Sequence, residues 1–213
     1  MRRLLAGPTL ARGVPLGLAG AVSCVPYIWQ ATPASTLRTM QLCYLPVVTT
    51  ILALVTVAWG PQERSWREQV RQGGRLALPL GLILACIYSL FEDRYLREYL
   101  PGRYPTNVWA VVLALPWVGL FQTLFVVTST YAFAFRLGRR QTVAMVAVVL
   151  AHQGLLLLQL HAYLPAEVLA VAVVFTGLHG LALGWSYILV GFAGPVVVAM
   201  VCHLRHLVRI LLT

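Results

Sequence analysis

Seven apolar segments recur along the chain, separated by short polar or basic connections. Most of them approach the ~20 residues that an α-helix needs to cross the hydrocarbon core of a bilayer. The segments are 14–30, 40–59, 76–91, 108–135, 142–160, 167–188 and 195–212. This pattern predicts an all-α protein, a polytopic bundle of about seven transmembrane helices. The first segment contains two prolines and lacks a clear small-residue cleavage site, so we expect a retained helix there and not a signal peptide.

Composition agrees with this class of protein. Hydrophobic residues make up 60% of the chain and charged residues 10%, which is too apolar a balance to surround a soluble core with polar surface. The net charge of +10 comes entirely from arginine on the basic side. The arginines cluster before the first segment, between the second and third, and after the fourth, so the excess requires no nucleic acid partner.

By the positive-inside rule, these clusters predict a cytoplasmic amino terminus, and we expect a bacterial inner membrane. Seven spans would then place the carboxyl terminus outside, against the local charge of Arg205 and Arg209. The alternatives are one re-entrant segment or a weak charge bias that is overridden.

Histidines supply the candidate chemistry, because His152, His179 and His203 fall in mid-membrane positions of the last three segments. An ionisable residue within a membrane helix is costly and is by default a functional hypothesis. Short connections make these helices antiparallel neighbours, so the imidazoles can lie at one depth. They could bind zinc, or each could hydrogen-bond a backbone carbonyl, Ser, Thr or Gln. We expect His161 and His206, near membrane edges, to be solvated.

Two stretches in the second half resemble a known family. GLALGWSYILVGFAGPVVVAMVCH carries a G-L-x-x-G-x-x-Y helix, a glycine-containing turn and a helix with His203, and RLGRRQTVAMVAVVLAHQ leads from an arginine-rich turn to His152. Both are similar to segments of the CAAX prenyl protease and bacteriocin-processing (CPBP, or Abi) intramembrane proteases. The resemblance covers roughly 108–212, and it divides the chain into amino-terminal membrane helices, 1–107, and CPBP-like core helices, 108–213.

The resemblance implies an intramembrane endopeptidase that cleaves membrane or lipidated peptides. His152 and His203 would be catalytic and would be the ligands of a divalent metal such as zinc. Family members also carry E-E-x-x-x-R about thirty residues before the first histidine, but here that window reads GLFQTLFVVTSTYAF, with Gln122 near the expected pair. A glutamine amide can orient water but cannot accept its proton. Leu207 stands where the family has Asn or Asp.

The incomplete catalytic set leaves several interpretations open. The chain could be a working peptidase, a non-catalytic pseudoprotease, or a membrane subunit or carrier whose histidines and glycine-rich helices serve packing or a transport pathway. Glu92, Asp93 and Arg97 spell E-D-x-x-x-R, and Glu92 is the next candidate base. Their segment, FEDRYLREYLPGRYP, is polar and bounded by proline, so we expect a solvated interfacial turn.

Overall fold

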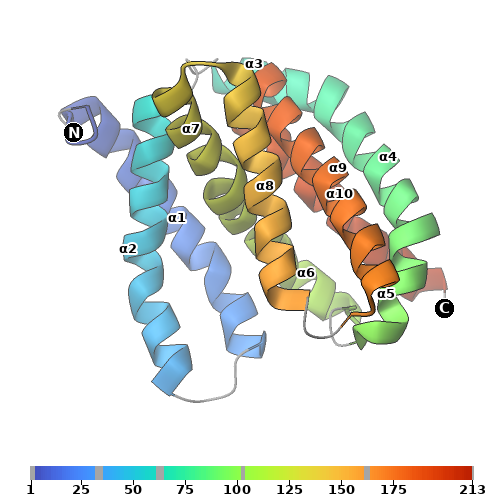
Figure 1. The fold of residues 1–213 in the computed structure, drawn as a ribbon. Helices are drawn as coiled ribbons and strands as arrows, with labels where there is room; N and C mark the ends of the chain where they lie inside the picture. Colours follow the sequence, from blue (N-terminus) through green and yellow to red (C-terminus); the bar gives the residue numbers. More distant parts are fainter. Residues whose placement is uncertain (1–2, 32–35, 61–64, 102–103, 161–163, 213) are drawn as a thin grey trace.

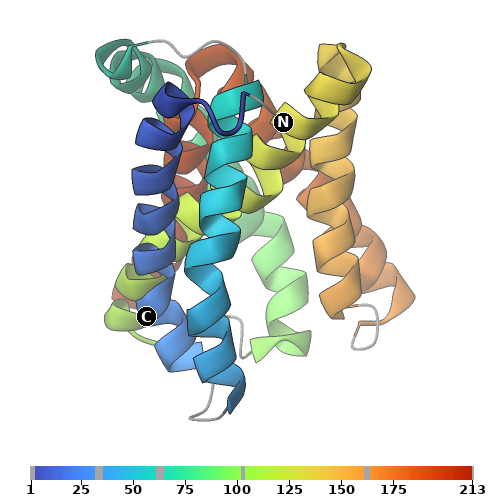
Figure 2. The same ribbon diagram turned by 90° about the vertical axis from the view of Figure 1, so that its left-hand side faces the viewer.

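The computed structural model describes residues 3–31, 36–60, 65–101, 104–160 and 164–212, and every regular element in these ranges is a helix. The elements, with η marking π-helical stretches, are α1 (Gly7–Ala31), α2 (Thr36–Trp59), α3 (Trp66–Gln72), η1 (Gly73–Ala77), α4 (Leu78–Ile87), η2 (Tyr88–Glu92), α5 (Asp93–Tyr99), α6 (Val108–Pro116), η4 (Trp117–Ser129), α7 (Thr130–Gly138), α8 (Gln141–Leu160), α9 (Ala166–Val190) and α10 (Ala193–Leu212). The all-α prediction is confirmed for these residues. Figures 1 and 2 show α1 and α2 paired at one flank of a single bundle.

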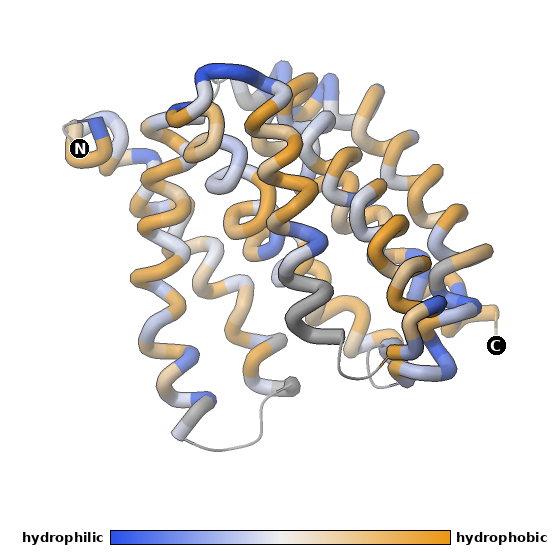
Figure 3. Tube along the Cα trace, viewed as in Figure 1, coloured by the Kyte–Doolittle hydropathy of each residue, from blue (hydrophilic) through white to orange (hydrophobic). Residues whose placement is uncertain are grey.

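Five helical runs are long and apolar enough to cross a membrane. They are Arg38–Trp59, Arg67–Phe91, Val108–Gly138, Ala166–Val190 and Ala193–Leu212. Figure 3 shows the apolar colour running along the middle of the helices, while hydrophilic stretches gather mainly at their ends. Large side chains such as Trp109 and Leu150 are exposed, as expected where lipid replaces water around the bundle. The chain is thus suited to be an integral membrane protein.

The count of seven spans stays a prediction. The two expected segments that are not among the five runs, 14–30 and 142–160, lie in helices α1 and α8. Two of the elements that carry basic clusters, α3 and the α7–α8 connection, lie at the same end of the bundle. Helix α5 lies at the opposite end (Figures 1 and 2).

The helix that begins at Trp66 is longer than the sequence pattern predicts. The sequence predicts a span at 76–91 and a polar turn from 92 onward. Instead, α3, η1, α4, η2 and α5 follow one another as a continuous helical run from Trp66 to Tyr99. The turn prediction was wrong because the helix continues past the apolar stretch and carries Asp93 with it.

Residues from both sides of position 107 share the largest core. Ala77, Leu84 and Tyr88 pack with Val127 and Leu183 in one buried cluster. The early helices therefore belong to the same packed unit as the second half of the chain. This matters for the site, since residues before 108 can contribute side chains to it.

Glycine allows the close approach of α8 and α9 that the sequence predicts. A Cβ atom at Gly180 would lie 3.2 Å from both the Cα of Val149 and the Cβ of His152. This distance is tighter than ordinary van der Waals contact, so a larger residue would push α8 away. The absence of a side chain at Gly180 thus helps fix the position of His152.

The turn between α9 and α10 also requires glycine. Gly191 has φ of +99°, a conformation that residues with a Cβ rarely adopt. The amide N–H of Ala193 donates to the Oε1 atom of Gln69, 3.3 Å away, which ties this turn to α3. The turn reverses the chain so that α10 packs against α9.

Candidate functional site

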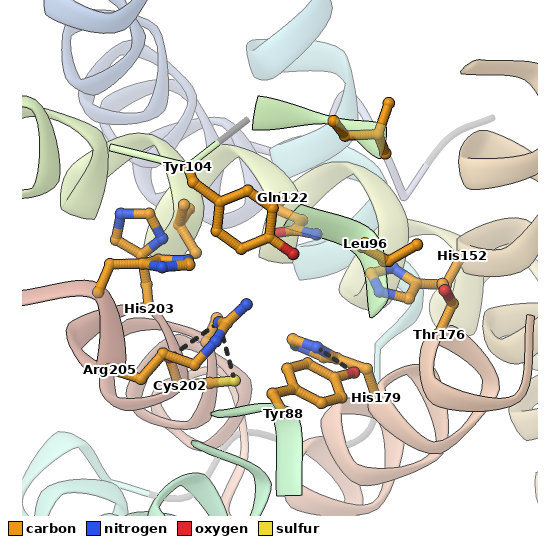
Figure 4. Close-up of a pocket in the computed structure, with 14 residues that line it drawn as sticks. Tyr88, Leu96, Tyr104, Gln122, His152, Thr176, His179, Cys202, His203 and Arg205 are labelled. Carbon is orange, nitrogen blue, oxygen red and sulfur yellow. Dashed lines mark hydrogen bonds between the residues drawn. The ribbon is translucent and has the colours of Figure 1, made fainter. Parts of the chain in front are cut away.

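A cavity of about 280 Å³ lies between the helices and is lined by polar and apolar side chains together (Figure 4). They come from η2, η4, α8, α9, α10 and the segment around α5. The lining residues are Tyr88, Leu96, Leu100, Tyr104, Val118, Gln122, His152, Thr176, His179, Ala199, Cys202, His203, Arg205 and His206. A cavity holds a water molecule once it offers ~10–15 Å³ and polar partners, so this one has room for several waters or for part of a ligand.

The three residues that stand nearest to the catalytic positions of the CPBP family all line this cavity. Gln122 comes from η4, His152 from α8 and His203 from α10. Figure 4 shows His152 and His203 on opposite sides of the space, with Gln122 between them. The structure therefore brings these residues to one cavity, and their catalytic role stays a prediction.

His179 belongs to a short chain of hydrogen bonds. Its Nδ1 lies 2.9 Å from the hydroxyl oxygen of Tyr88, and that hydroxyl donates to the backbone carbonyl of Phe175 at 2.8 Å. The ring of His152 lies beside it, with 5.1 Å between the two centroids. The hydrogen-bonded role considered for His179 is therefore realised for one ring nitrogen, with a tyrosine as the partner.

A second pair of histidines lies on α10. The rings of His203 and His206 are 5.2 Å apart, and the ring of Tyr104 meets His206 edge to face at 5.6 Å. His206 is only 5% exposed, so the expectation of a solvated side chain was wrong. Burial follows because Tyr104 covers that turn of α10. His161, expected to be solvated as well, lies outside the described residues.

Asp93 and Arg205 form a buried ion pair at the cavity. The Nε atom of Arg205 donates to Oδ2 of Asp93 and Nη2 donates to Oδ1, each at 3.1 Å. The two side chains are 11% and 13% exposed respectively. The guanidinium also lies over the ring of Tyr88, 5.1 Å from its centroid. The expectation of a solvated turn was therefore wrong for Asp93; the side chain of Glu92 lies outside the described residues.

The ion pair changes the electrostatics of the cavity. A lone guanidinium in a membrane interior is costly, but the carboxylate of Asp93 neutralises it with two parallel charge-assisted hydrogen bonds. Both oxygens of Asp93 are engaged, so this carboxylate is poorly placed to accept a proton from water. The Nη1 atom of Arg205 donates to the Cys202 carbonyl at 3.0 Å, which fixes the guanidinium against α10.

Metal binding receives no support from the arrangement of the described residues. Within them, no group of three or more His, Cys, Asp or Glu side chains is placed to hold an ion. Zinc–nitrogen bonds are ~2.0–2.1 Å long, so two ligands of one ion must lie close together. Figure 4 shows His152 and His203 across the cavity from each other. Zinc coordination by His152 and His203 therefore stays a prediction.

Sequence reasoning missed several residues that shape the cavity. Tyr88 and Tyr104 gave no signal, because tyrosine is common near membrane interfaces. Arg205 did carry a signal, since it is a charged residue within an apolar segment, but we interpreted it only as a topology determinant. Its carboxylate partner is 112 positions away in the chain.

Comparison of the chain with protein-family models, curated proteins and solved structures gives no match. The resemblance to CPBP intramembrane proteases therefore stays a hypothesis that rests on the residues quoted above.

Proposed function

We propose that this protein is a CPBP-like integral membrane hydrolase that cleaves a peptide bond of a membrane or lipidated peptide. One observation carries the proposal: Gln122, His152 and His203, the residues nearest to the family's catalytic positions, all line one cavity inside the helix bundle. The location that we propose is a bacterial inner membrane. A cytoplasmic amino terminus is supported by the position of α3 and the α7–α8 connection, which carry basic clusters, at one end of the bundle.

The composition of the cavity suits a peptide group that leaves the lipid phase. An amide loses hydrogen bonds when it is desolvated, and a polar cavity within an apolar bundle can replace them. The Gln122 amide and the imidazole N–H groups can donate to a carbonyl oxygen. Donors aimed at the oxyanion that develops during attack are commonly the largest electrostatic contribution to acyl-transfer catalysis.

The proposal requires a base other than a carboxylate. Gln122 replaces the glutamate that the family uses, and both oxygens of Asp93 accept from Arg205. The imidazoles of the cavity remain as its groups with a basic ring nitrogen. We therefore assign the acid–base chemistry of the site to histidine.

The test is cleavage of a panel of tagged membrane and lipidated peptides by the purified protein in lipid. We expect the wild type to cleave at least one peptide, and His152→Ala and His203→Ala each to lower the rate by ~10²-fold or more. Gln141→Ala, an exposed position at the start of α8, is the matched control and should cleave like the wild type.

Two results would contradict a hydrolase. A silent wild type combined with activity in Gln122→Glu would identify a pseudoprotease whose base has been lost. No cleavage by any variant, Gln122→Glu included, would favour the other class of protein, a membrane subunit or carrier in which the histidines serve packing or a pathway.

A further inference from the structure

The orientation of hydrogen bonds around His179 determines which of its ring nitrogens carries hydrogen. The hydroxyl of Tyr88 has one hydrogen, and this hydrogen is donated to the carbonyl oxygen of Phe175. The oxygen of Tyr88 must then accept from His179, so Nδ1 of the imidazole is the protonated nitrogen. In the neutral ring, Nε2 consequently carries a lone pair.

No described residue donates a hydrogen bond to that lone pair. The Nε2 atom of His179 is buried, and it has no hydrogen-bond partner among the described residues. A buried acceptor without a partner costs free energy, so natural proteins keep few of them, and a catalytic role is one established reason. His179 lines the cavity, and Figure 4 shows its ring projecting into it beside Tyr88.

His179 shares the cavity with an ion pair and with a second imidazole. The guanidinium of Arg205 lies over the ring of Tyr88 and donates two hydrogen bonds to the carboxylate of Asp93. His152 stands next to His179 and faces the same cavity.

We infer that His179 is the general base of this site and that Tyr88 is the positioning residue that holds its tautomer, an inference that rests on the proposed hydrolase function. Nε2 removes a proton from water as the water oxygen bonds to the peptide carbonyl carbon, and the carbonyl π electrons move onto oxygen. The tetrahedral intermediate then expels the amine as the C–N bond breaks. The leaving nitrogen takes the proton from Nε2, which restores the neutral imidazole.

This role differs from a structural one in a way that His179→Asn can reveal. The asparagine amide nitrogen can occupy the place of Nδ1 and keep the donation to Tyr88, whereas nothing replaces Nε2. We expect this variant to retain the thermal midpoint of the wild type in lipid but to lose ~10²-fold or more in cleavage rate. A structural histidine would tolerate the same change with little loss of activity.

Chemical rescue provides a second variant in case the first misfolds. His179→Ala leaves a gap beside the cavity, and added imidazole should enter it and restore part of the lost rate. The control is Gln153→Leu, which removes the hydrogen bond from Gln153 on α8 to the Val173 carbonyl on α9. Neither residue lines the cavity. Any loss of rate in this control should not respond to imidazole.

The tautomer can be read without any substrate. With ¹⁵N-labelled histidine and the His179→Asn spectrum for assignment, wild-type His179 should show protonated Nδ1 and unprotonated Nε2. Tyr88→Phe should move this signal toward the opposite tautomer and lower kcat more than it raises KM. Protonated Nε2 in the wild type, or full activity in His179→Asn, would overturn the inference.

The two proposals fail in distinguishable ways. Absence of cleavage by the wild type refutes the hydrolase function, and with it the base, even when the spectrum shows the expected tautomer. Cleavage that depends on His152 and His203 but survives in His179→Asn leaves the hydrolase intact and refutes only the base assigned here.

Discussion

Removal of the Asp93 carboxylate should destabilise the protein strongly. Asp93→Leu would leave the guanidinium of Arg205 buried without its two charge-assisted hydrogen bonds, at a site where both side chains are less than one-seventh exposed. Two opposite charges ~4 Å apart attract by about 4 kcal/mol at an effective dielectric constant near 20. Breaking a buried pair by removing one partner typically costs about 3–5 kcal/mol. We expect a loss within this range.

The double variant Asp93→Leu/Arg205→Leu separates the charge effect from packing. Replacement of both ions by apolar residues removes the uncompensated charge, so it should cost less than Asp93→Leu alone. The free energy of unfolding would be measured by denaturant titration in mixed micelles for both single variants and the double variant.

Glu98→Ala, an exposed carboxylate on the same helix as Asp93, is the control and should change stability by less than about 0.5 kcal/mol. A loss below about 1 kcal/mol for Asp93→Leu would refute the reasoning. Single-variant costs that simply add in the double variant would refute it as well, because they would show that the two charges are not coupled.

Packing between helices gives further predictions that the same unfolding measurement tests. Gly194→Ala should cost about 1–3 kcal/mol, since the new Cβ would lie 2.3 Å from the carbonyl oxygen of Ser186; unchanged stability would contradict this close approach. Gly154→Ala, where the Cβ meets nothing within 4 Å, should instead stabilise the helix by about 0.5–1 kcal/mol, and a loss would show an unrecognised contact. Thr56→Val and Thr128→Val each remove the 3.0 Å hydrogen bond between these hydroxyls, so each should cost about 0.6 kcal/mol, and additive costs in the double variant would argue against the bond.

The sequence predicted which residues of the site come together where their helices follow one another in the chain, and it failed where the contacting residues are distant in the chain. Short connections make α8, α9 and α10 successive neighbours, so the common depth of their histidines follows from helix length alone. Gln122 could be placed near them only through the family resemblance. His206 was misjudged because its distance from the end of an apolar segment says nothing about the tyrosine that covers it.

Sequence reasoning could predict neither the Asp93–Arg205 ion pair nor the Tyr88–His179 hydrogen bond, because the partners of each are far apart in the chain. Asp93 and Arg205 are 112 positions apart, and Tyr88 and His179 are 91 apart. The ion pair depends on the helix that begins at Trp66 continuing past its apolar stretch and packing along α10, and the Tyr88–His179 bond depends on η2 of the same helix packing against α9. Local hydropathy marked the polar segment that follows the apolar stretch as a turn, since hydropathy reports composition and not the helical continuity that tertiary packing maintains.

The sequence alone determined the class of protein and its helices. Apolar segments of membrane-spanning length must satisfy their backbone groups internally, and in lipid only helices and closed barrels do so. Tertiary structure alone decided which arginine is neutralised, which histidine is covered and which ring nitrogen retains a lone pair. Those properties arise from contacts between residues far apart in the chain, and no local pattern encodes them.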